Sequence, residues 1–154
     1  MSQLRVKTQP PPLANRLAVL IGGDVLVLLL FIWFGRGSHN FPITDVMGGL
    51  FAAAPFIISW FLIAPWFGLF RAEVSQVWRK LVPRLLLAWL ICGPLAAVLR
   101  ALFLGRPLPG GIIPIFVLVT TVVGCLLMLA WRLAYLWGAN RRLHQAEDAN
   151  RLRA

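Results

Sequence analysis

Charged side chains lie inside apolar stretches of this chain that are long enough to cross a membrane. Asp24 lies within the run at 17–35, and Arg132 lies within the run at 112–137. A charge at the centre of a bilayer costs about 2.5 to 3.5 kcal/mol on insertion scales, so such residues pair with one another or mark an ion pathway. These two side chains are therefore the first candidates for a functional site.

The depth of each charge decides which partner it can reach. From the ends of their runs, Asp24 lies roughly 10 Å and Arg132 roughly 7 Å from the same membrane boundary, at about 1.5 Å per residue. Arg100, in the run at 85–104, would lie about 22 Å from that boundary, and a gap of roughly 12 Å is too large for a hydrogen bond. We therefore predict an Asp24–Arg132 pair, and place Arg100 toward Asp45 or the headgroups as a secondary pair on the outer side.

Two roles are open for the Asp24–Arg132 pair. It can hold two helices together, with extension of Arg132 to the interface as a structural variant, or it can belong to a proton or ion path. Relays in membranes generally use chains of Asp, Glu and His, and no second acid lies at the depth of Asp24. We therefore favour the first role, in which the pair locks two helices together. If this is right, combining D24R with R132D should restore the expression that either single substitution loses.

The remaining polar residues give no set that is typical of catalysis, metal binding or cofactor binding. His39 and His144 lie outside the apolar runs, and Cys92 and Cys125 lie inside them without a CxxC spacing. A zinc site needs about four ligands, and a haem site in the membrane needs an axial ligand such as a histidine within a span. We expect no enzymatic activity, no cofactor and no metal.

The elements that must position these residues are four apolar runs. The chain is 60% hydrophobic and only 13% charged, against about 25% charged in soluble domains. Runs of at least about 18 apolar residues indicate membrane-spanning helices. We therefore predict an all-α integral membrane protein with four transmembrane helices in a compact bundle. The expected transmembrane domain covers residues 17–137, with spans at about 17–35, 47–70, 85–104 and 112–137.

The charged residues predict the orientation of the bundle. Three basic residues lie in the proline-rich segment 1–16, four in 71–84 and four in the tail 138–154, whereas the opposite loops hold only Arg36 and Arg106. Cytoplasmic loops carry the excess of Lys and Arg, so we expect a flexible cytoplasmic arm, a cytoplasmic tail and a multi-pass position in the cell (inner or plasma) membrane. The lipid bilayer then accounts for the net charge of +10, and nucleic acid is not expected as a partner.

Local signals refine the spans. Pro55 and Pro65 predict a kinked second helix, whose aromatic residues Trp60, Trp66 and Phe70 are interpreted as an interfacial belt. The segment 71–83 has apolar residues at helical spacing, so it is either a short helix in the headgroup plane or a basic loop. The small pair Gly22-Gly23 indicates a close helix contact, and Gly138 is interpreted as a helix stop.

Five short motifs lie in or beside the four runs. They are the acid Asp24, then Gly35-Arg36-Gly37-Ser38-His39, Ala54-Pro55-Phe56, Leu99-Arg100 and Ala130-Trp131-Arg132. Together they resemble DUF3054, a family of small bacterial and archaeal membrane proteins of unknown function, over roughly residues 20–135. The resemblance implies a four-span membrane protein and supplies no activity, substrate or cofactor.

Two classes of function follow from these features. The first is a structural or accessory membrane subunit without chemistry of its own, joined to copies of itself or to a larger complex because so small a bundle buries little surface. The alternative is a small oligomeric transporter or channel with a polar path near Asp24 and Arg132. A dry, mutually saturated contact between these two side chains would favour the first class, and a water-accessible cavity would favour the second.

Overall fold

Helices make up the regular structure of the residues that the structure describes. The computed structural model describes residues 13–38, 42 and 44–151, so His39, most of the predicted arm (1–12) and the last three residues lie outside the described part. Its elements are α1 (Leu13–Gly37), α2 (Val46–Ile63), α3 (Ala72–Ser75), α4 (Trp78–Phe103) and α5 (Pro114–Arg151). Within the described part, α1, α2, α4 and α5 are long and apolar enough to cross a membrane. The predicted all-α fold with four transmembrane helices is confirmed.

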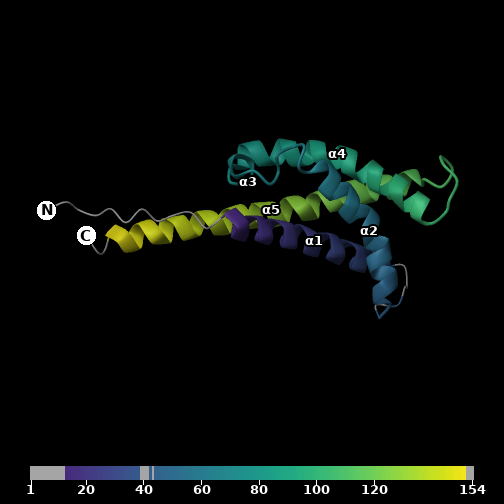
Figure 1. The fold of residues 1–154 in the computed structure, drawn as a ribbon, viewed down its shortest axis with the longest axis horizontal. Coiled ribbons are helices and arrows are strands. Elements are labelled where there is room, and N and C mark those ends of the chain that lie inside the picture. Colours follow the sequence, from purple (N-terminus) through teal and green to yellow (C-terminus); the bar gives the residue numbers. More distant parts are fainter. Residues whose placement is uncertain (1–12, 39–41, 43, 152–154) are drawn as a thin grey trace.

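The four long helices form a closed bundle. Helix α4 packs against α2 and α5, and α1 packs against the same two helices from the other side. Figure 1 shows the start of α1, the short α3 and the projecting part of α5 toward one end of the molecule. We call this the inner end. The connections α1–α2 and α4–α5 lie at the opposite, outer end, and assignment of the inner end to the cytoplasm stays a prediction.

Helix α2 ends at Ile63, before the predicted boundary at residue 70. Pro65 has no N–H to continue the helical ladder, and Gly68 has a φ of 65°, a left-handed conformation that glycine adopts without strain. The backbone N–H of Gly68 donates to the Pro65 carbonyl at 2.9 Å, and that of Leu69 donates to the Ala64 carbonyl at 3.2 Å. These paired bonds are those of a glycine C-cap, so the chain turns inside the predicted second span.

The segment after this turn divides into two helices. Helix α3 covers only Ala72–Ser75, and α4 already begins at Trp78, seven residues before the predicted start of the third span at 85. Val74 is buried, whereas Trp78 is 57% exposed, so the apolar residues of 71–83 do not share one face. Neither of the two interpretations of this segment describes it fully.

Helix α5 is longer than the fourth predicted span. It passes through Gly138 and continues to Arg151, so the interpretation of Gly138 as a helix stop is wrong. A glycine inside an exposed helix costs only about 1 kcal/mol relative to alanine, and good helix formers follow it. At about 1.5 Å per residue, 38 residues extend about 57 Å, nearly twice the roughly 30 Å hydrocarbon thickness. The end of α5 therefore projects beyond the other helices (Figure 1).

Two stacked tryptophans fill the centre of the bundle. Trp60 of α2 and Trp89 of α4 are buried, and their ring centroids lie 5.7 Å apart at an interplanar angle of 29°. Gly124 of α5 lies against the Trp89 ring, where a Cβ atom would come within 2.6 Å of it. The absence of a side chain at this glycine lets α5 approach α4 closely, and the tryptophan pair fixes the distance between α2 and α4.

Candidate functional site

Asp24 of α1 and Arg132 of α5 form a two-pronged ion pair inside the bundle. Arg132 Nε donates to Asp24 Oδ1 at 2.9 Å, and Arg132 Nη2 donates to Asp24 Oδ2. The two side chains are 0% and 1% exposed. A guanidinium matches a carboxylate in this fork geometry, which gives direction as well as energy. The structure therefore brings the two predicted residues together as direct partners across α1 and α5.

Two tryptophans complete the coordination of the carboxylate. Trp60 Nε1 of α2 donates to Asp24 Oδ2 at 2.8 Å, and Trp131 Nε1 of α5 donates to Asp24 Oδ1 at 3.0 Å. An ionised carboxylate has about four acceptor sites, and the four donors of Arg132, Trp60 and Trp131 occupy them. The carboxylate is fully satisfied within the described part of the chain.

Sequence reasoning missed both indole donors. The prediction placed Trp60 in an interfacial belt because the second span was expected to reach residue 70, but the side chain is 0% exposed. Trp66, which the same prediction included, is 85% exposed. Trp131 precedes Arg132 in the sequence, and this adjacency was the one signal that pointed to it. The direction of an indole N–H depends on helix rotation, which the hydropathy pattern does not specify.

Arg132 also stabilises the turn that ends α2. Its Nη1 donates to the Leu69 carbonyl at 2.8 Å, and its guanidinium lies 5.0 Å from the centroid of the Phe70 ring. Irregular backbone at membrane depth is tolerated only where its polar groups find partners in the protein. One arginine thus connects α1, α5 and the segment after α2.

A second arginine holds the same turn from the other side. Arg16 of α1 is 7% exposed; its Nη1 donates to Ser75 Oγ at 3.0 Å and its Nη2 to the Phe70 carbonyl at 3.1 Å. The sequence prediction counted Arg16 with the flexible arm, because a basic residue at the start of a span usually lies among headgroups. The structure instead makes it part of the polar cluster at the inner end.

Glycine at position 23 allows this cluster to close. A Cβ atom at Gly23 would overlap the ring of Trp131, whereas a Cβ atom at Gly22 would meet nothing within 4 Å. The close helix contact predicted for Gly22-Gly23 therefore involves the second glycine. It brings α1 near enough to α5 for the Trp131 indole to reach Asp24.

The outer pair differs from the prediction. Asp45 accepts from Arg36 Nη2 at 2.7 Å, not from Arg100; Arg36 lies in the last turn of α1, nine residues before Asp45. Asp45 also caps α2, where its Oδ1 accepts from the Gly48 backbone N–H at 2.9 Å. This backbone bond, and after it the bond and charge of Arg36, lower the pKa of Asp45. Arg100 instead lies with its guanidinium 5.1 Å from the Phe116 ring centroid.

The contact between Asp24 and Arg132 is buried, and its polar groups find their partners within the protein. The charges of Asp24 and Arg132 cancel each other, and the acceptor sites of the carboxylate are occupied. In the part of the chain that the structure describes, no group of three or more His, Cys, Asp or Glu residues could hold a metal ion. The structure thus shows a buried contact in which both carboxylate oxygens of Asp24 accept two hydrogen bonds each.

Comparison with known proteins assigns the chain to a family. A family model described as a protein of unknown function, DUF3054, matches residues 21–135. The match covers most of the chain and includes both Asp24 and Arg132, so the protein belongs to this family. It excludes Arg16 and the projecting end of α5. No curated protein and no solved structure matches the chain.

Proposed function

We propose that this DUF3054 protein is a structural or accessory subunit of the cell membrane, with no chemistry of its own. In this proposal the Asp24–Arg132 contact locks α1 to α5 and fixes the shape that the subunit presents to its partners. The observation that carries the proposal is the buried carboxylate whose two oxygens accept four hydrogen bonds.

The same observation weighs against a transport path through these residues. A carboxylate that relays protons or binds ions needs an acceptor site open to water or to the ion. At Asp24 those sites are occupied by Arg132, Trp60 and Trp131. Releasing them would leave a buried guanidinium and two indole N–H groups without partners, each at a cost of about 1–3 kcal/mol or more.

The outer surface of the bundle supports a membrane role for the subunit. Large apolar side chains are exposed on all four spanning helices, including Leu26, Leu62, Leu90 and Leu126. Such surface suits lipid tails or neighbouring helices and would be unfavourable in water. We expect this face to contact the bilayer together with further copies of the chain or a larger membrane complex.

A flux measurement distinguishes the lock from a polar path. The full chain and its D24N variant are reconstituted into liposomes, and proton, sodium, potassium and chloride fluxes are compared with those of protein-free liposomes. We expect the wild type to show no flux above the protein-free background. A wild-type flux that D24N abolishes while its melting temperature is retained would overturn the proposal, and if D24N does not fold, a wild-type flux alone overturns it.

A second experiment tests the accessory role. The full chain is purified from its native membrane in a mild detergent after cross-linking in the intact membrane, and the stoichiometry of the product is determined by mass spectrometry. We expect a defined homo-oligomer or a stoichiometric membrane partner. A chain that stays monomeric in both the membrane and the detergent would contradict this part of the proposal.

A further inference from the structure

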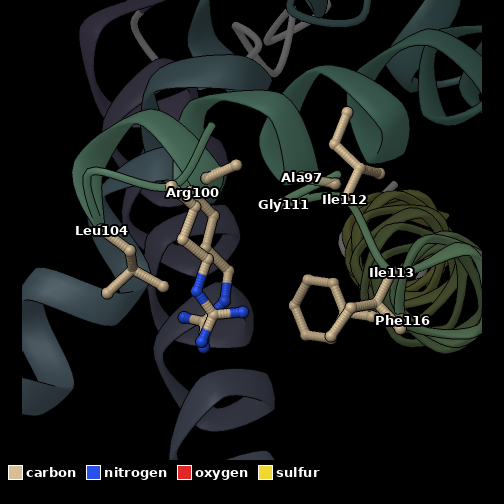
Figure 2. A pocket seen from close by; sticks show the side chains of 9 residues that line it. Ala97, Arg100, Leu104, Gly111, Ile112, Ile113 and Phe116 are labelled. Carbon is tan, nitrogen blue, oxygen red and sulfur yellow. The ribbon is translucent and has the colours of Figure 1, made fainter. Parts of the chain in front are cut away.

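A pocket of about 160 Å³ lies at the outer end of the bundle, far from the Asp24–Arg132 pair. The last turns of α4, the connection to α5 and the first turn of α5 line it. Figure 2 shows the Arg100 side chain descending from α4, with Leu104 on one side and Phe116 on the other. The pocket is therefore a cleft lined by the partly buried Arg100, by the exposed Arg106 and by apolar side chains.

Positive charge gathers in and around this pocket without an equal number of carboxylates. Arg100 and Arg106 both line it, and the charge of Arg36 also acts on Arg100. In the described residues, the acid at this end is Asp45, and its side chain is engaged by Arg36 and by the Gly48 backbone N–H. Like charges held together repel one another, so an anion in the pocket would relieve this repulsion.

The guanidinium of Arg100 is positioned to receive such an anion. In the described residues it contacts the Phe116 ring and forms no ion pair with a carboxylate. Arginine presents its donors in a planar fork that suits phosphate and carboxylate groups. Arg100 lies three residues before the end of α4 at Phe103, about 4.5 Å from the helix end, which is the depth of lipid headgroups in a spanning helix.

We propose that the pocket between α4 and α5 binds an oxyanion of the phosphate type, held by Arg100 and Arg106. The group is carried by a phospholipid headgroup or is free phosphate. The apolar walls favour the lipid: Leu104 and Ile113 line the pocket and are 44% and 49% exposed. They offer a surface for the first carbons of an acyl chain. This site is separate from the inner lock and does not depend on its role.

Binding to the purified full chain tests the proposal. The chain is placed in a phosphate-free detergent, and retention of phosphatidylglycerol, of neutral diacylglycerol and of inorganic phosphate is measured by native mass spectrometry and by the change in melting temperature. The variants are R100Q, R106Q, the double variant and the conservative R100K. R79Q is the matched control for loss of one positive charge, because Arg79 is exposed and lies at the inner end.

We expect the wild type and R79Q to bind phosphatidylglycerol but not diacylglycerol, and R100Q and R106Q to bind it at least about tenfold more weakly, as for loss of a charge-assisted hydrogen bond. R100K should fall between them, because it keeps the charge and loses the fork. Binding of the lipid that millimolar phosphate does not displace identifies a headgroup site. Phosphate binding with the same dependence on Arg100 and Arg106 identifies a free-anion site.

Three results would overturn the proposal. The first is that neither the lipid nor phosphate binds to the wild type. The second is equal retention of phosphatidylglycerol by the wild type and by the double variant. The third is an equal loss of binding in R79Q, which would show that total charge and not the pocket decides. Melting temperatures of R100Q and R100K show whether each variant is folded. If R100Q does not fold, the comparison of R100K with the wild type still tests the proposal.

Discussion

The inner and outer ends of this bundle use the same residue types in opposite ways. At the inner end, Asp24 and Arg132 are fully buried and every acceptor of the carboxylate is occupied. At the outer end, Asp45 and Arg36 form an ion pair in which the side chains are 47% and 20% exposed. Among the described residues, the nearby Arg100 has an aromatic partner but no carboxylate partner. The inner cluster is closed, whereas the outer one is open to an added anion.

This difference follows from the distance of each cluster to water. A buried charge must be satisfied entirely within the protein, because an unpaired one is strongly destabilising. An exposed pair is screened by water and contributes little, so its partners are less strictly determined. A saturated cluster is therefore suited to hold the fold, and an unsaturated one near the surface is suited to bind a ligand.

Breaking the inner pair is expected to have the largest effect. R132Q removes one partner and leaves the Asp24 carboxylate buried, so we expect a loss of about 3–5 kcal/mol in the free energy of unfolding. R36Q, in the exposed outer pair, should cost much less. Melting temperature and chemical unfolding in detergent measure both variants, and equal losses would remove the distinction between the two ends.

The indole donors of Trp60 and Trp131 change what we expect of double variants that keep the Asp24–Arg132 contact free of an unpaired charge. In the charge swap of D24R with R132D, the indole N–H groups of Trp60 and Trp131 would face a guanidinium, which accepts no hydrogen bond. In a double leucine variant the same two groups and the Leu69 carbonyl would lose their partners. We therefore expect neither double variant to recover the wild-type melting temperature, whereas an ion pair without further donors around it would allow recovery. Full recovery would show that the two indoles contribute little.

The two stacked tryptophans allow the hydrogen bond to Asp24 to be measured separately. Trp60 donates to the carboxylate, whereas Trp89 Nε1 has no hydrogen-bond partner within the described residues. Both lose similar ring area on substitution by phenylalanine. We expect W60F to destabilise the fold by about 1.5–3 kcal/mol more than W89F, as for a bond to a charged group. Equal free energies of unfolding for W60F and W89F would contradict a stabilising hydrogen bond from Trp60 to Asp24.

Adjacent glycines test how tightly the inner cluster is packed. Alanine at Gly23 must displace the Trp131 ring, and overpacking of this kind costs about 1–3 kcal/mol. Alanine at Gly22 meets no atom within 4 Å and should be neutral or stabilising by up to about 1 kcal/mol, because alanine favours helix more than glycine does. The melting temperature of G23A should thus fall, whereas that of G22A should stay unchanged or rise. A stable G23A would show that Trp131 can move without loss.

The smallest expected effect is a pH dependence at the outer pair. Because the pKa of Asp45 is lowered in the folded protein, its charge stabilises the fold above the unfolded pKa of about 3.9. This contribution disappears as the pH falls through the lowered folded value. D45N keeps a good helix cap but not the charge, so the small advantage of the wild type at pH 7 should vanish in acid. A constant difference in melting temperature between pH 7 and pH 3 would contradict this assignment.

The amino-acid sequence by itself determined the class of protein, the number of spanning helices and the pairing of Asp24 with Arg132. Apolar run length reports on membrane crossing, and the constant rise of a helix converts residue number into depth, so sign and depth were enough to select Arg132 and to reject Arg100. Only the tertiary structure decided which side chains surround the pair, because the rotation of each helix about its axis depends on packing with its neighbours. The indoles of Trp60 and Trp131, the early end of α2 at Ile63 and the choice of Arg36 by Asp45 all depend on that rotation or on loop conformation, which depth along one helix does not specify.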